Sequence, residues 1–178
     1  DLMHKYILTF AMASLTACTP SQPPDPSAGS LFPQPETARG PVLPQDTGYL
    51  VEEIRDGVYW LTNGHYHVMF VTTGEGVIVV DAPRNLVNLI RPAVAEIPGE
   101  PLPHLTHSHF DSDPIGAAYV LNDTAVIIAQ HEALRLLAEA ADPKRPLPAV
   151  TFDETYTLRV GDQTLELRYP GPNHDTGS

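Results

Sequence analysis

Hydrophobic and polar residues alternate in short runs along the chain after residue 47, and this two-residue period predicts β-strands. Turn signals at Asp56-Gly57 and Asn63-Gly64 separate the first of these runs and indicate hairpins. The run Gly76–Val80 is apolar throughout, so we expect both faces of that strand to be covered. The predicted strands are Tyr49–Ile54, Val58–Thr62, His67–Thr72, Gly76–Val80, a short strand at Leu105, Ala125–Ala129, Val150–Phe152, Tyr156–Val160 and Thr164–Tyr169.

Apolar residues recur every three or four positions in two other segments, which is the spacing of an amphipathic helix. These segments are Asn85–Ile97 and His131–Ala141, and a third helix is expected from Ile115 to Leu121, directly after Pro114. The element order is a strand meander, then alternating helices and strands, and then more strands. It predicts an α/β fold, an α+β sandwich in which helices pack outside the sheet layers.

The first 47 residues follow a different pattern. Met3-His-Lys-Tyr is a short basic start, and Ile7–Leu15 is apolar but too short to span a bilayer. Residues 18–47 contain many Pro, Ser, Gln and Gly residues and have no hydrophobic period. We therefore expect residues 18–47 to form an extended tether ahead of a single folded domain, residues 48–178.

Cys18 is the single cysteine, so no internal disulfide can form. Leu15-Thr-Ala-Cys18 resembles the lipobox of bacterial lipoprotein precursors. The resemblance implies a signal peptide at residues 3–17 and a lipid on the Cys18 thiol that anchors the chain to a membrane. Because Thr19 rather than an aspartate follows, the expected location is the bacterial cell envelope, on the outer membrane facing the periplasm. The alternative is a soluble protein with a chance cysteine in an apolar leader.

Charge limits the range of partners. The formal net charge of -12 argues against a nucleic-acid partner, because phosphate contacts need a basic surface. We expect a small-molecule substrate, and contact with the membrane only through the N-terminal lipid.

Four potential metal ligands lie within seven residues between the predicted strand at Leu105 and the helix that follows. They are His107, His109, Asp111 and Asp113. Imidazoles and carboxylates that converge on a strand-to-helix turn are the ligands of a metallohydrolase site. The alternative is that Asp111, Ser112 and Asp113 are turn residues that cap the helix.

The turn and its neighbours resemble the metallo-β-lactamase fold superfamily. Val77-Ile-Val-Val-Asp81 is similar to the family's strand that ends in a structural aspartate. Ile115-Gly-Ala resembles its Ile-Gly-Gly, and Gly171-Pro-Asn-His174 resembles its later Gly-Pro-x-His segment. The resemblance covers residues 48–178 and implies the N-terminal half of an αββα fold. The family's second half does not follow, so we expect the chain to be truncated.

The family's ligand motif, His-x-His-x-Asp-His, is not reproduced, and two alignments are open. The gapless alignment is preferred because it keeps the strand, turn and helix lengths. It fills the four ligand positions with His109, Asp111, Asp113 and Pro114. The alternative needs two extra residues and fills them with His107, His109, Asp111 and Ser112. Both lack the final histidine.

The resemblance implies a metal-dependent hydrolase. His109, Asp111 and His174 would hold one divalent ion, and Asp113 would orient the attacking water or hold a second ion. Zinc is expected, as one ion rather than two, and the carboxylate ligand gives manganese or iron some preference. A metal-activated water would attack an ester, lactone, amide or phosphoester. The alternative is a degenerate, non-catalytic, lipid-anchored binding domain, which Pro114 and Asp111 favour.

The remaining histidines and two aromatic residues are given structural or surface positions. His65 and His67 are expected on the surface, with the mouth of the site as the alternative. His131 is expected in the first turn of its helix, and His104 in a structural role. Trp60 and Phe70 are expected in the core.

Overall fold

The computed structural model describes residues 40–97, 101–173 and 176–177, and the chain from Gly40 onward forms one compact unit. The expected signal peptide at residues 3–17, the lipidation site Cys18 and the expected metal ligand His174 lie outside the described residues. Across the described part of the chain, no helix combines the length and the apolar character needed to cross a bilayer.

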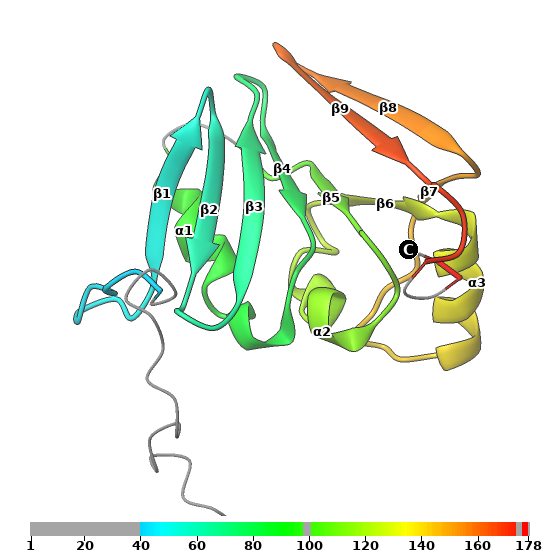
Figure 1. Cartoon of the computed structure of the whole chain (residues 1–178), viewed down its shortest axis with the longest axis horizontal. Coiled ribbons are helices and arrows are strands. Elements are labelled where there is room, and N and C mark those ends of the chain that lie inside the picture. The colour runs from blue at the N-terminus through cyan, green and yellow to red at the C-terminus, as the bar shows by residue number, and fades with distance from the viewer. Residues whose placement is uncertain (1–39, 98–100, 174–175, 178) are drawn as a thin grey trace, which may run out of the picture. The chain divides into compact units, whose positions relative to one another are not determined.

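Seven strands form the main sheet, and they lie side by side in the order in which they occur in the sequence (Figure 1). The first four are antiparallel neighbours, whereas the fourth to seventh are parallel. The strands are β1 (Leu50–Arg55), β2 (Val58–Thr62), β3 (His67–Thr72), β4 (Val77–Val80), β5 (His104–Thr106), β6 (Val126–Gln130) and β7 (Val150–Phe152). Each agrees with its predicted strand to within a residue or two.

The last two strands form a separate hairpin, β8 (Thr155–Val160) and β9 (Gln163–Arg168), drawn in orange at the upper right of Figure 1. Leu158 of this hairpin packs against Ile78 of β4 and Ile128 of β6. The hairpin therefore covers one face of the parallel half of the sheet.

The main core fills the opposite face of the sheet. Strand β4 illustrates this division, because Val77 and Val79 belong to the main core whereas Ile78 faces the hairpin. The prediction that this strand is covered on both faces is confirmed. Phe70 is fully buried in the main core and stacks on Tyr59 with ring centroids 5.3 Å apart.

The helices are shorter than predicted. A turn of 3-10 helix, η2 (Arg84–Leu86), and the helix α1 (Ile90–Ala95) replace the single helix expected over Asn85–Ile97. Pro92 explains the interruption, since it lacks an N–H and its ring would clash with the carbonyl four residues earlier in a continuous helix. The helix must therefore restart within the two residues before Pro92.

The helix after the candidate ligand turn also differs from the prediction. It starts at Ser112 instead of Ile115, because proline is tolerated in the first turn, where its missing N–H has no partner to lose. This helix, α2 (Ser112–Ile115), is a single turn, and the 3-10 turn η3 (Ala118–Val120) follows it. Asp111 lies at its N-cap but makes no capping hydrogen bond through its side chain.

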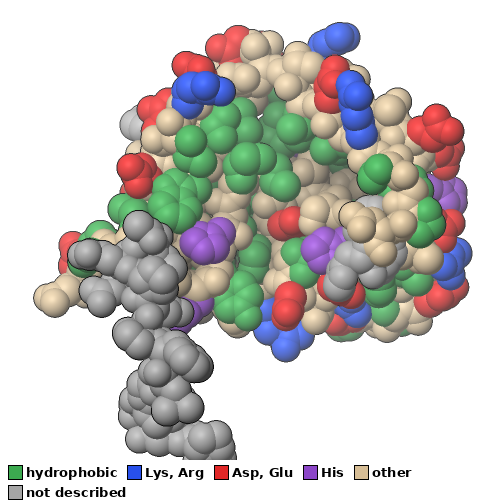
Figure 2. All heavy atoms as spheres, viewed as in Figure 1, with side chains coloured by type: hydrophobic (Ala, Val, Ile, Leu, Met, Phe, Trp, Pro, Cys, Tyr) green, Lys and Arg blue, Asp and Glu red, His purple; other side chains and the backbone are tan. Residues whose placement is uncertain are grey.

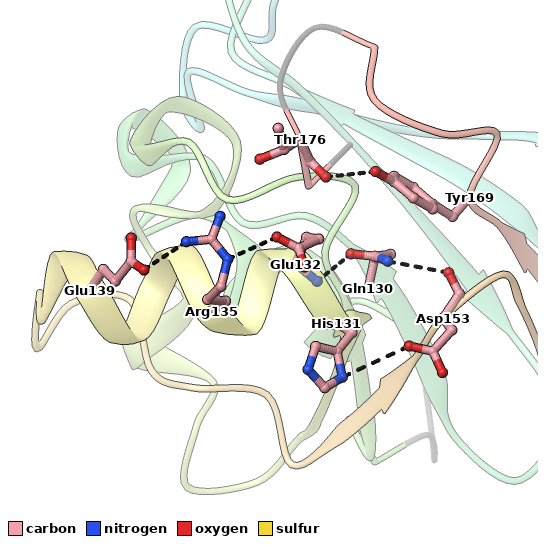
Figure 3. A network of polar contacts seen from close by, with 8 residues as sticks. All are labelled: Gln130, His131, Glu132, Arg135, Glu139, Asp153, Tyr169 and Thr176. Atoms are coloured by element: carbon pink, nitrogen blue, oxygen red, sulfur yellow. Dashed lines mark hydrogen bonds and ion pairs between the residues drawn. The ribbon is translucent and has the colours of Figure 1, made fainter.

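Helix α3 (His131–Ala140) matches its prediction closely, and His131 lies in its first turn as expected. The Gln130 side chain caps the helix by accepting from the Glu132 N–H and donates to the Asp153 carbonyl at 3.2 Å (Figure 3). Arg135 bonds Glu132 and Glu139 along the exposed surface of the helix. These contacts fix the start of α3 beside the end of β7.

Candidate metal centre

Asp81 joins the end of β4 to the candidate ligand turn. Its backbone N–H donates to the Thr106 carbonyl at 2.8 Å, at the last residue of β5. Its carboxylate accepts twice from Ser108, from the backbone N–H at 2.8 Å and from the hydroxyl at 2.6 Å. The backbone of Asp81 is left-handed, with φ +65°, which turns the chain sharply after the strand. Asp81 thus holds the turn in place from the neighbouring strand.

Ser108 connects Asp81 to His109. The Ser108 hydroxyl oxygen lies 2.7 Å from His109 Nδ1. A hydroxyl has one proton, and with Asp81 ionised that proton is donated to the carboxylate, so Oγ accepts from the Nδ1–H of His109. The ring is then held in the tautomer whose Nε2 carries the lone pair. Burial raises the pKa of Asp81, and the two hydrogen bonds from Ser108 partly offset that shift.

His107, on the other side of Ser108, is buried and makes no side-chain hydrogen bond. It is 6% exposed, and neither ring nitrogen has a partner. Burial lowers the pKa of His107 to about 4, against a smaller opposing contribution from the Thr106 backbone, so the ring is neutral at physiological pH. A buried polar group without a partner destabilises a fold by about 1–3 kcal/mol. Neutral imidazole is also the form that binds a metal ion.

The two carboxylates of the turn lie at the start of α2. Asp111 is half-buried at the N-cap, and Asp113 is exposed in the first turn. Within residues 40–97, 101–173 and 176–177, no three His, Cys, Asp or Glu side chains are close enough together to hold a metal ion. The donor types of the turn fit a transition metal, and the unpartnered His107 ring is the specific observation that supports one.

The segment after β9 returns to the start of α3. Tyr169 donates its hydroxyl proton to the Thr176 carbonyl at 2.7 Å, as Figure 3 shows. Gly177 lies so close to α3 that a Cβ on it would be 3.0 Å from the Ala133 nitrogen. These contacts fix the positions of the described residues that flank positions 174 and 175.

A cavity of about 320 Å³ adjoins the turn, and Asp81 lines it. Its other lining residues are Trp60, His67, Val68, Met69, Val80, Pro83 and Pro114. The prediction that Trp60 belongs to the core is corrected here: the indole is half-buried, stands in the cavity wall and stacks on His67 at 5.3 Å. His65 and His67 are exposed as expected, and His67 lines this cavity.

Solved structures identify the fold. BJP-1, a subclass B3 metallo-β-lactamase of Bradyrhizobium japonicum, superimposes with a TM-score of 0.62 at 20% identity, over 71% of this chain and 53% of that chain. MIM-1 from Novosphingobium pentaromativorans gives 0.62 at 21% identity, over 72% and 53%. FEZ-1 from Legionella gormanii gives 0.61 at 14% identity, over 71% and 55%. The fold is that of a metallo-β-lactamase.

This chain spans about half the length of these metallo-β-lactamases. No family model matches it. A curated relative, the 2,4-dinitroanisole O-demethylase subunit alpha of Nocardioides sp. (strain JS1661), is 25% identical over 132 residues, which are 71% of this chain and 40% of that protein. The expected fold class is confirmed. The choice between the two ligand alignments stays a prediction.

Proposed function

We propose that this chain is part of a metal-dependent hydrolase with the metallo-β-lactamase fold and that the turn after β5 supplies its first metal ligands. The observation that carries the proposal is the position of Ser108. It binds Asp81 with both its backbone N–H and its hydroxyl, and one of the two candidate imidazoles stands on each side of it. A carboxylate and hydroxyl that fix a histidine ring are a common support for a metal ligand.

The unpartnered nitrogens of His107 favour the alternative alignment. We propose His107 and His109 as imidazole ligands and Asp111 as the carboxylate ligand, with His174 from the later segment. The gapless set, in which His107 has no role and Asp113 takes a ligand position, is the competing assignment. In both sets, imidazole and carboxylate donors match what zinc, manganese or iron requires of its ligands.

The reaction proposed is hydrolysis of an ester, lactone, amide or phosphoester. A bound divalent ion lowers the pKa of a water and polarises the scissile bond. Among the chain's own residues, Asp81 and Ser108 hold the His109 ring in one orientation. Asp113, exposed in the first turn of α2, is proposed to orient the attacking water. The relative's name specifies a small nitroaromatic ether, which supports a small-molecule substrate for this chain as well.

The location is part of the same proposal. A lipid on Cys18 would attach the enzyme to the outer membrane, with residues 18–47 as the tether and the domain in the periplasm. Globomycin, which blocks lipoprotein signal cleavage, should make a precursor accumulate in the producing cells, and Cys18→Ala should abolish membrane retention.

Metal analysis of the purified full chain tests the function. About one transition-metal ion should remain after dialysis, and His107→Ala and His109→Ala should each lose it. The matched control is His131→Ala, because His131 is an exposed histidine on α3 far along the chain from the turn. Retention in His107→Ala with loss in His109→Ala and Asp113→Ala would select the gapless ligand set.

The second candidate function is a non-catalytic binding domain. It is favoured by the lack of a three-residue metal group among the described residues and by Pro114, which has no donor atom. A protein that has native circular dichroism but holds no metal, even after incubation with Zn²⁺, Mn²⁺ or Fe²⁺, would exclude the hydrolase and leave this function.

A further inference from the structure

The cavity beside Asp81 has an aromatic and apolar wall. Paired residues of three neighbouring strands form this wall. Trp60 of β2 pairs with Met69 of β3, and Met69 pairs with Val80 of β4. Paired residues lie on one face of a sheet, so these three side chains form a row across it. His67 stacks on the indole with an interplanar angle of 10°, which extends the flat part of the wall.

This wall lies on the sheet face that turns away from the main core. Figure 2 shows hydrophobic side chains gathered over β2 and β3 on the viewed face. Met69 is 37% exposed. The Trp60 indole N–H donates to Glu52 of β1 at 3.4 Å, so its polar edge already has a partner. The ring therefore offers the cavity hydrophobic surface.

The charges around the cavity limit the ligand. Among the described residues that line it, Asp81 is the only carboxylate and none is Lys or Arg. The whole chain has a formal net charge of -12, which repels anions at longer range. The volume of about 320 Å³ lies at the lower end of the range for small-molecule sites, which suits one or two rings. Flat apolar walls, a thioether and the lack of a cation together favour an aromatic compound without negative charge.

We propose that this cavity binds an aromatic ring without negative charge, stacked along Trp60 and Met69, with its substituent directed at Asp81 and the turn. The proposal extends the proposed function by naming the substrate class, because Asp81 both lines the cavity and holds Ser108. Ring binding itself requires no metal. Failure of the ring site and failure of the hydrolase are therefore separate results.

Trp60 is the only tryptophan in the chain, so tryptophan fluorescence, excited selectively over that of the tyrosines, reports on this wall alone. The full chain, kept metal-free with EDTA, is titrated with 4-nitrobenzyl alcohol, a neutral nitroaromatic quencher. We expect saturable quenching, in contrast to the linear quenching of free N-acetyltryptophanamide. Benzyl alcohol should displace the probe at concentrations about twofold to tenfold lower than cyclohexylmethanol does, since a ring–ring contact adds to the effect of buried area.

Two variants locate the site. His67→Ala and Met69→Ala should each weaken the binding of 4-nitrobenzyl alcohol, by about twofold to tenfold. The matched control is His65→Ala, because His65 is also an exposed histidine but does not line the cavity. Circular dichroism confirms that each variant is folded, and either lining variant alone is sufficient for the comparison.

Three results would overturn the proposal. One is quenching of the wild type that remains linear with probe concentration. Another is equal displacement by benzyl alcohol and cyclohexylmethanol, which would mean a general apolar surface. The third is a loss of binding in His65→Ala as large as in His67→Ala. The charge argument is tested separately with 4-nitrobenzoate, whose binding must be weaker than that of the alcohol for the inference to stand.

Discussion

His107 should make the metal-free protein sensitive to acid. Its pKa is lowered by burial to about 4, from 6.5 in the unfolded chain. Between these values the unfolded state binds more protons than the folded state, so stability rises with pH. The contribution of His107 is therefore complete above about pH 6.5 and is lost as the pH falls from 6.5 toward 4.

The size of the effect follows from the same two values. One protonating group whose pKa falls from 6.5 to about 4 lowers the free energy of unfolding by about 3 kcal/mol between pH 7 and pH 4. Solvent screening reduces this little, because the side chain is 6% exposed and both nitrogens lack partners. Since small domains are stable by about 5–15 kcal/mol, a loss of this size is readily measured.

The test compares the wild type with His107→Leu by urea unfolding in EDTA at several pH values. The leucine removes the titrating ring and its two unpartnered nitrogens, so at neutral pH we expect equal stability or a gain of up to about 2 kcal/mol. By about pH 4.5 the difference in favour of the variant should have grown by a further 2 kcal/mol or so. Parallel pH profiles for the two proteins would refute the reasoning, and His65→Leu, at an exposed position, serves as the control.

Three further substitutions test individual contacts of the fold, each by urea unfolding at neutral pH. Ser108→Ala should lower the free energy of unfolding by about 1–2 kcal/mol, because Asp81 loses its hydroxyl donor but keeps the backbone one. Phe70→Ala, in the fully buried core, should lower it by about 3–5 kcal/mol. Gly161→Ala should lower it by at least about 2 kcal/mol, because φ is +54° and a Cβ would lie 1.8 Å from the Thr73 carbonyl oxygen. A cost below half of any of these values would contradict the corresponding contact.

The strands could be predicted from the sequence because their signals are local. Alternation and turn residues set the bounds of β2 and β3, and both match the structure at every residue. The continuously apolar run of β4 correctly indicated cover on both faces, now seen as the main core against Val79 and the hairpin against Ile78. In each case the pattern reports which side of the chain is buried, and a strand has only two sides.

The helices were harder to predict, because the spacing of apolar residues does not show where a proline removes a backbone N–H. The apolar residues between Asn85 and Ile97 were consistent with one helix, yet Pro92 removes an N–H in the middle of that segment and forces a restart. Pro114 has the opposite effect, since it fits inside the first turn of α2 and lets the helix begin before it. The same residue type shortened one helix and moved the start of another, depending on which hydrogen bond it would have made.

The site was only partly predictable, because its decisive contact joins distant residues. The structural role of Asp81 was implied by the family resemblance, but its partner Ser108 is 27 positions away and was not singled out as that partner. Trp60 was expected in the core because large aromatic residues are mostly buried. Its real position depends on what packs over that face of β2 and β3, which the residues of those strands do not specify.

Two features at the turn and the neighbouring end of β4 disfavour folding. Burial lowers the pKa of His107 and leaves its ring without a partner, while burial also raises the pKa of Asp81. A leucine at position 107 would leave no polar atom unpaired, so hydrogen bonding within the fold gives no reason for the imidazole. Local sacrifices of stability are typical of functional sites. A bound cation would resolve both features at once, since it would be the missing partner of His107 and would favour the charged form of Asp81 through Ser108 and His109. A turn without a bound cation offers no compensation for either feature, and this is the physical basis of the proposed metal centre.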